Sequence, residues 1–295
     1  MLEPILDGMR HPSLVSRFLY RNIFGGGGNP NGVDVFEADW DNLIILDACR
    51  FDAFQNIACP HFSGSLRKIE SQGSATFEWI QQNFSGLDLM DTVYVSANGW
   101  LHRIQDSIDA SIHAGNWLYT EEFRNGMGTV PPAMITDEAL DWADKYPNKR
   151  LLVHYVQPHK PFLGDVAEQY FPHARGINMV EMMAQADDAT PSILEKAYRE
   201  TLEIAIPEVK RLVNGLDGKT VISADHGELL GERYPTMPFR NFGHPHGVYV
   251  PELVEVPWFE CDYDTRREII SEHATSEAQK DEQEIKEHLE AMGYV

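Results

Sequence analysis

The sequence predicts an α/β domain with a doubly wound, mostly parallel sheet and helices on both faces. Three observations predict this class. Short apolar runs of strand length recur along the chain, stretches with helical spacing separate them, and carboxylate or imidazole side chains directly follow several of the runs. Strands that alternate with helices form parallel sheets covered on both sides. A chain of 295 residues is long enough for one such domain with a large core.

The first predicted strand is an uninterrupted apolar run at 43–46, bounded by Asp41 and Asp47. Such a run is typical of a buried parallel strand. Further strands are expected at 92–96, 151–156 and 220–223. Helices are expected between the strands, at 77–84, 136–145 and 190–216. Pro207 is expected to kink or divide the last of these helices.

Three parts are expected along the chain. Residues 1–39 form an arm with a glycine-rich, flexible stretch at 25–30, residues 40–262 form the main domain, and residues 263–295 form a helical tail. In the tail, Ile285, Leu289 and Met292 recur at helical spacing, which predicts an amphipathic helix. The less regular stretch 163–189 is either a cap over the site or a packed insertion.

The net charge restricts the partners. Lys and Arg total 24 against 46 Asp and Glu, which is a formal net charge of −22. Dense negative charge repels phosphate backbones and anionic lipids, so we expect no binding to nucleic acid or to an anionic membrane. Solubility in the salt-rich cytoplasm of a halophilic organism would explain the acidity, and an acidic interaction surface is the alternative.

No apolar run of about 18 residues occurs, and the first residues lack the pattern of a secretory signal. We therefore expect a soluble, cytoplasmic protein without a membrane span. The three cysteines, Cys49, Cys59 and Cys261, are too few and too scattered for a disulfide framework.

Two segments after predicted strands carry metal-ligand residues. Asp47 ends the first strand, at the sheet edge where ligands bind in doubly wound folds, although a lone Asp there is also a common helix cap. Asp225 and His226 follow the strand at 220–223, and Gly227 allows a sharp turn after them. Carboxylate oxygen and neutral imidazole nitrogen suit zinc, manganese or another divalent cation. Asp47, Asp225 and His226 therefore form a candidate three-residue set.

The segment 71–80 holds the candidate nucleophiles. Thr76 is expected at the N-cap of the helix 77–84, where backbone N–H groups and the helix dipole favour a bound anion. Ser74 is the competing candidate. Both types of residue are also the commonest helix caps, which is the structural alternative. A metal would lower the pKa of either hydroxyl.

Three more positions are candidates for contacts with an anionic substrate or a second cation. His159 and Lys160 follow the strand at 151–156 and would bind anionic oxygens or protonate a leaving group. Arg50 either binds the anion or pairs with a carboxylate such as Asp52. His244 and His246 lie in a glycine-flanked loop, as ligands of a second cation or as substrate contacts.

Together, the segments 46–52, 158–161, 223–228 and 243–244 resemble the sulfatase-like branch of the alkaline phosphatase superfamily, and their order along the chain matches as well. The resemblance covers about residues 40–260. It implies an alkaline phosphatase-like core, a metal held by Asp47, Asp225 and His226, and a covalent enzyme intermediate. It also implies that His159 binds substrate or acts as an acid.

Two departures narrow the resemblance. The Cys-x-Pro-Ser-Arg type motif of formylglycine sulfatases is absent, and Asp47 is followed by Ala48 and Cys49 in place of a second acidic residue. The pattern is closer to relatives that use Thr or Ser, such as phosphodiesterases and the phosphoglycerol and phosphoethanolamine transferases.

The predicted function is metal-dependent hydrolysis or transfer of a phosphate or sulfate ester through a Thr or Ser nucleophile. The expected substrate is a small-molecule or glycan ester, and the expected cofactor is one or two divalent ions of Zn, Mn or Ca. The alternative is a degenerate, non-catalytic family member that binds an anionic glycan or a protein partner. Its support is the missing second acidic ligand and the open choice between Thr76 and Ser74 as nucleophile.

Overall fold

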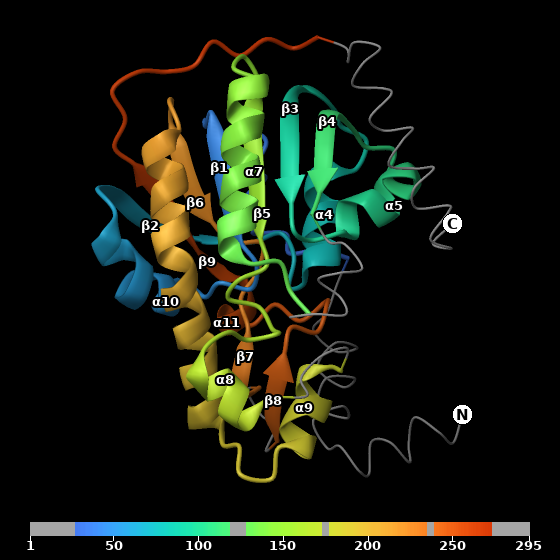
Figure 1. Cartoon of the computed structure of the whole chain (residues 1–295). Coiled ribbons are helices and arrows are strands. Elements are labelled where there is room, and N and C mark those ends of the chain that lie inside the picture. The colour runs from blue at the N-terminus through green and yellow to red at the C-terminus, as the bar shows by residue number, and fades with distance from the viewer. Residues whose placement is uncertain (1–26, 119–127, 173–176, 235–238, 273–295) are drawn as a thin grey trace, which may run out of the picture.

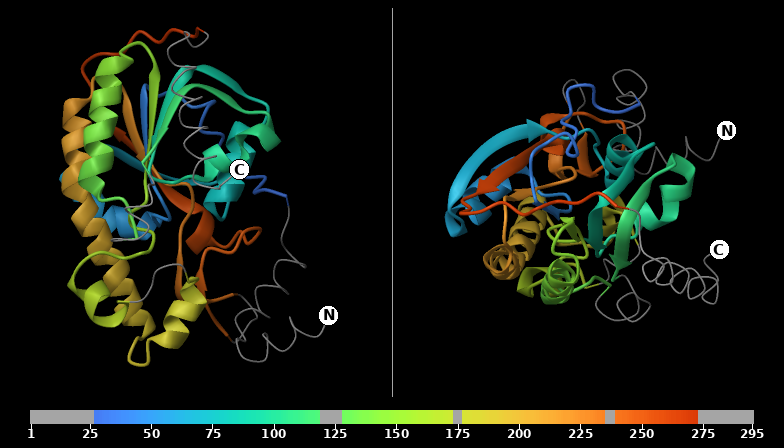
Figure 2. Two further views of the ribbon diagram at one scale, coloured as in Figure 1. Left: turned by 45° about the vertical axis from the view of Figure 1, so that its right-hand side comes forward. Right: turned by 90° about the horizontal axis from the view of Figure 1, so that it is seen from above.

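The computed structural model describes residues 27–118, 128–172, 177–234 and 239–272, which form a central sheet with helices on both faces (Figures 1 and 2). The sheet has seven strands in the order β2-β9-β6-β1-β5-β3-β4. Within this sheet, β9 runs antiparallel to its two neighbours, β2 and β6. The other neighbouring strands pair in parallel. A small second sheet pairs β7 with β8. The predicted fold class, a doubly wound, mostly parallel sheet, is confirmed.

The strand bounds are β1 Asn42–Leu46, β2 Gly64–Glu70, β3 Asp88–Ser96, β4 Ser111–Trp117, β5 Arg150–Tyr155, β6 Thr220–Ser223, β7 Leu229–Arg233, β8 Arg240–Gly243 and β9 Glu255–Cys261. β1 lies in the middle and every one of its residues is buried. It pairs in parallel with β5 on one side and β6 on the other. The carboxyl ends of these three strands therefore meet at one edge of the sheet.

The helix bounds are α3 Phe51–Ala53, α4 Thr76–Phe84, α5 Trp100–Ile108, α7 Pro132–Lys145, α8 Asp165–Tyr170, α9 Met179–Gln185, α10 Pro191–Gly215 and α11 Pro251–Val254. Short π- and 3₁₀-helical turns at Phe54–Ala58 and Cys59–His61 follow α3. The view from above shows α7 and α10 on one face of the sheet and α4 on the other (Figure 2). Stacking helices on both faces buries the apolar strands completely.

Two helix predictions need correction. α10 runs through Pro207 as a single helix, so the prediction that this proline divides it is wrong. α7 begins one turn before Thr136, because Pro132 provides a favourable first helical residue. The irregular stretch at 163–189 contains α8 and α9.

The strands missing from the prediction lack a clean apolar run. β2 lies at the sheet edge with most of its residues exposed or half-buried. β9 lies between β2 and β6 but contains Pro257, and a proline in a sequence argues against an interior strand. Pro257 has no N–H to donate, but its C=O accepts a hydrogen bond from Ser223 Oγ of β6 at 2.7 Å.

Both ends of the described chain pack on the domain. Val33 bridges to Ser71 and Val35 is buried, so this part of the predicted arm contacts the core. Arg266 forms ion pairs with Asp39 and Asp41. The amphipathic helix predicted in the tail lies outside the described residues. Among the helices in the described ranges, none is both long and apolar enough to cross a membrane.

Candidate active site

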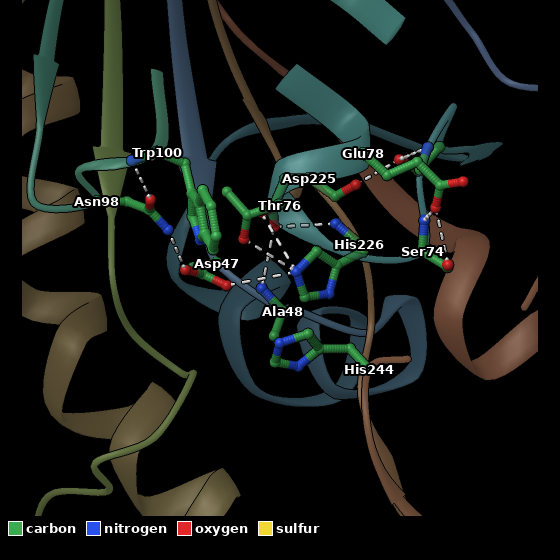
Figure 3. Close-up of polar contacts among 12 residues, drawn as sticks. Asp47, Ala48, Ser74, Thr76, Glu78, Asn98, Trp100, Asp225, His226 and His244 are labelled. Atoms are coloured by element: carbon green, nitrogen blue, oxygen red, sulfur yellow. Dashed lines mark hydrogen bonds and ion pairs between the residues drawn. The ribbon is translucent and has the colours of Figure 1, made fainter. Parts of the chain in front are cut away.

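The predicted metal ligands come together at the carboxyl edge of the sheet, where β1, β5 and β6 end (Figure 3). Asp47 follows β1 directly, and its backbone is held by Tyr155 O, 3.1 Å from Asp47 N, and by His159 N, 3.1 Å from Asp47 O. Asp225 and His226 follow β6. The parallel register thus brings together residues that lie far apart in the sequence.

Each carboxylate has one oxygen fixed and one oxygen free. Asp225 Oδ1 accepts hydrogen bonds from the backbone N–H groups of Ala48 (3.1 Å) and His226 (2.9 Å). Asp47 Oδ2 accepts one from Asn98 Nδ2 at 2.9 Å. Asp47 Oδ1 and Asp225 Oδ2 are buried without a hydrogen-bond partner. A buried carboxylate oxygen without a partner is costly, so both oxygens require a cation or a proton.

The free nitrogen of His226 faces the same two oxygens. Its Nδ1–H donates to Gly227 O at 2.7 Å, since a carbonyl can only accept, and this leaves the lone pair on Nε2. Nε2 lies 3.6 Å from Asp47 Oδ1 and 3.4 Å from Asp225 Oδ2. Burial lowers the pKa of His226 and keeps the imidazole neutral, despite the nearby Asp225. A neutral imidazole with its lone pair directed at two carboxylates fits a divalent cation.

The metal-free site is electrostatically unfavourable. Burial raises the pKa of Asp47 well above its ordinary value, and the charge of Asp225 raises it further. The donor hydrogen bond from Asn98 opposes this rise. A bound cation would remove the repulsion between the two carboxylates, so the residues present fit the expected metal.

Thr76 adjoins the site, and Ser74 does not. Thr76 is the first residue of α4, one position after the N-cap residue Ala75, and its Oγ1 lies 3.2 Å from His226 Nε2. Ser74 points away from Asp47 and Asp225 (Figure 3). Its Oγ accepts the N–H of Val248 and lies within hydrogen-bond distance of Glu78 Oε2. The Ser74 hydroxyl thus ties a loop to the helix, which leaves Thr76 as the candidate nucleophile.

A second cluster lies beside the first. His244 Nδ1 is 3.0 Å from Glu228 Oε1, and Glu228 is fully buried. The His244 ring is 4.5 Å from the His226 ring and 4.9 Å from the His159 ring, measured between centroids. His159, Glu228 and His244 offer ligand atoms within 4.8 Å of one another. This cluster could hold a second cation or the anionic oxygens of a substrate.

The electrostatics of this second cluster favour uncharged bases. Burial lowers the pKa of His159 well below its ordinary value, and the neighbouring His244 and Lys160 lower it further. Burial also lowers the pKa of Lys160, while Glu228 and Asp47 oppose this shift. Lys160 therefore gives up its proton more readily than an exposed lysine, as a proton donor to a leaving group requires.

Two predicted site residues are placed elsewhere. The Arg50 guanidinium bonds to Asp52 through Nε (2.9 Å) and Nη2 (3.0 Å), and its Nη1 pairs with Glu232. Of the two interpretations of Arg50, the structure shows the carboxylate pairing. His246 is exposed in a turn and is in neither of the candidate metal clusters of the described residues. The His246 side chain, two residues after His244, therefore lies outside the site.

Sequence reasoning missed Asn98, His154 and Glu228. Asn98 comes shortly after β3, just as Asp47 and Asp225 come after β1 and β6, so its position after a parallel strand was the available signal. Glu228 lies in the segment 223–228 that carries the family resemblance, but no role was predicted for it. His154 lies inside an apolar strand and carries no sequence signal for a site.

No family model matches the chain, and no curated protein matches it. Similar solved structures include a putative sulfatase from Bacteroides thetaiotaomicron (12% identity, 79% of this chain, 66% of that chain, TM-score 0.48). A second is a phosphonate monoester hydrolase from Silicibacter pomeroyi (12% identity, 79% of this chain, 69% of that chain, TM-score 0.45). A third is the C-terminal periplasmic domain of EcEptC from Escherichia coli in complex with Zn (13% identity, 74% of this chain, 72% of that chain, TM-score 0.44).

With TM-scores below 0.5, the likenesses do not identify a substrate. The chemistry of this protein therefore rests on its own side chains.

Proposed function

We propose that this protein is a metal-dependent phosphoester hydrolase or phosphotransferase with Thr76 as its nucleophile. One observation carries the proposal. The unpartnered oxygens of Asp47 and Asp225 converge on His226 Nε2, and the Thr76 hydroxyl lies 3.2 Å from the same nitrogen. Sulfate esters are the second substrate class, because the same residues would accept them.

Asp47, Asp225 and His226 would hold the cation. When bound, the cation would neutralise the anionic ester and lower the pKa of an adjacent hydroxyl. The donor set of two oxygens and one nitrogen suits Zn or Mn better than Ca.

Thr76 acts on the ester from the start of α4, where the helix dipole favours an anion. Its Oγ loses a proton to solvent and forms a bond to phosphorus, while the bond from phosphorus to the leaving oxygen breaks. Lys160 donates a proton to that oxygen, because the buried His159 is an uncharged base. Water, or an acceptor alcohol in a transferase, then displaces the phosphoryl group from Thr76 and restores the hydroxyl.

Thr76 variants separate catalysis from folding. Thr76→Val keeps the shape of the side chain and removes the hydroxyl, so the rate constant should fall at least about a thousandfold while bound metal persists. Thr76→Ser keeps the hydroxyl and should retain measurable activity. Chromogenic phosphate monoesters, phosphate diesters and sulfate esters, assayed in high salt, identify the substrate class.

Metal content tests the cation site. Elemental analysis of the purified protein should find a divalent metal in the wild type and none in Asp225→Asn. Asp52→Asn is the matched control, because Asp52 pairs with Arg50 outside the site and makes the same change of group. A wild type that holds no metal and cleaves no ester after metal addition would instead favour a non-catalytic binding protein.

A further inference from the structure

His154 is a buried imidazole that faces the candidate cation site from β5. The residue has no exposed surface, and its Nδ1 lies 2.8 Å from the hydroxyl of Tyr94. Its Nε2 has no hydrogen-bond partner and lies 3.6 Å from Asp225 Oδ2. A buried imidazole nitrogen without a hydrogen-bond partner is costly, although less so than an ionised carboxylate oxygen. The three orphaned atoms, on Asp47, Asp225 and His154, belong to one cluster.

The spacing of these atoms suits shared ligation better than hydrogen bonding. A hydrogen bond between nitrogen and oxygen has a length of about 2.7–3.2 Å. Two ligands of one tetrahedral zinc ion, at bond lengths of about 2.0–2.2 Å, lie roughly 3.4 Å apart. The separations from Asp225 Oδ2 are 3.4 Å to His226 Nε2 and 3.6 Å to His154 Nε2. Both imidazoles therefore lie at ligand distance from the same oxygen.

The hydrogen bond between His154 Nδ1 and the Tyr94 hydroxyl is of the kind that metal-bound histidines make. A ligating imidazole is neutral and donates its other N–H to an acceptor, which fixes the ring. The Tyr94 hydroxyl can accept this hydrogen from Nδ1, and Tyr94 is itself buried. Nε2 then carries the lone pair toward the two carboxylates.

We propose that His154 Nε2 is a direct ligand of the cation, and that Tyr94 orients it. The inference rests on the proposed function, since it needs a cation at Asp47 and Asp225. It extends the three-residue set that the family resemblance implies by a second imidazole. Two neutral nitrogens with two carboxylates neutralise a divalent ion and favour zinc-like transition metals over calcium, which prefers oxygen ligands.

X-ray absorption at the metal edge counts the imidazoles that bind the metal ion. Wild-type protein loaded with one equivalent of Zn²⁺ should show two imidazole ligands. The doubly substituted protein His159→Asn/His244→Asn, which lacks the imidazoles of the second cluster, should give the same count of two. A count of one in that protein overturns the proposal, because His226 then is the only imidazole ligand.

Variants of His154 and Tyr94 supply the second readout. Titration of metal-free His154→Gln with Co²⁺ should show an affinity at least about a hundredfold lower and an altered visible spectrum. Tyr94→Phe keeps the ligand and loses only its orienting partner, so its affinity should fall about tenfold with an unchanged spectrum. A His154→Gln spectrum identical to that of the wild type overturns the proposal while the cation site stands. A wild type that binds neither Zn²⁺ nor Co²⁺ overturns the proposed function as well.

Discussion

Asn98 donates its side-chain amide to Asp47 Oδ2 at 2.9 Å and thereby leaves Oδ1 of that carboxylate as the free oxygen. The other end of the Asn98 amide, Oδ1, accepts the N–H of Trp100 at the start of α5. One side chain thus links the turn after β3 to the candidate ligand after β1. Partners that orient a ligand in this way usually contribute to metal affinity.

Replacing Asn98 by Asp should lower the affinity for Zn²⁺ by about 10–100-fold. The substitution keeps the oxygen that caps α5 and replaces the donor to Asp47 by a repelling carboxylate. Competition with a chelator of known affinity measures the change. Asn98→Ala loses both functions and should bind equally weakly but with lower stability. Wild-type affinity in Asn98→Asp would show that the donated hydrogen bond does not orient Asp47.

Replacing Ser74 by Ala should destabilise the fold by about 1–3 kcal/mol without loss of catalysis. The buried N–H of Val248 and one oxygen of Glu78 would each lose a partner. Urea unfolding measures the free energy, and an ester assay of the folded variant measures the rate. A stable but inactive Ser74→Ala would return the nucleophile role to Ser74.

The pKa of Asp47 predicts how metal-free stability depends on pH. Because this pKa lies well above the ordinary value of 3.8, the folded protein holds a proton that the unfolded chain releases. Stability from this group is full below about pH 3.8 and is lost as the pH rises through the folded pKa. Asp47→Asn should therefore be more stable than the metal-free wild type at pH 8.

This advantage should shrink as the pH falls, because Asp47 in the wild type then gains its proton. Unfolding curves at pH 8, 6 and 5, all with chelator present, measure the difference. Addition of Zn²⁺ should reverse the order at pH 8, because only the wild type keeps the full ligand set. A difference that does not vary with pH would contradict an elevated pKa of Asp47.

Replacing Arg50 by Ala should reduce stability and leave the Michaelis constant within about threefold of the wild type. Its guanidinium already pairs with the exposed Asp52 and the partly buried Glu232, and the loss of such partly exposed pairs costs about 1 kcal/mol. Steady-state kinetics and thermal unfolding separate the two effects. A rise of the Michaelis constant by about tenfold or more would instead assign Arg50 to substrate binding.

Added salt should stabilise the protein, because its net charge of −22 is self-repelling. The Debye length falls from about 10 Å at 0.1 M to about 3 Å at 1 M, so the melting temperature should rise by more than about 5 °C over this range of KCl. Sucrose at equal osmolality is the control, since it does not screen charge. An equal rise in both would exclude screening as the cause.

The sheet class and the main carboxylate and imidazole positions of the site follow from local sequence patterns. Asp47 after an apolar run, and Asp225 with His226 after another, required no tertiary information, because buried parallel strands are continuous apolar runs and their ends carry the ligand site. Thr76 was also identified, although the local sequence could not separate it from Ser74.

Which polar atoms contact one another depends on the three-dimensional arrangement of the strands. His154 lies in a strand whose other residues belong to the core, and its direction is set by the pairing of His154 with Ile45 across β1 and β5. Asn98 and the partners of Arg50 come from segments distant in sequence. Local patterns report which residues are buried, whereas hydrogen bonds and ligand sets depend on strand order and register, which no local pattern contains.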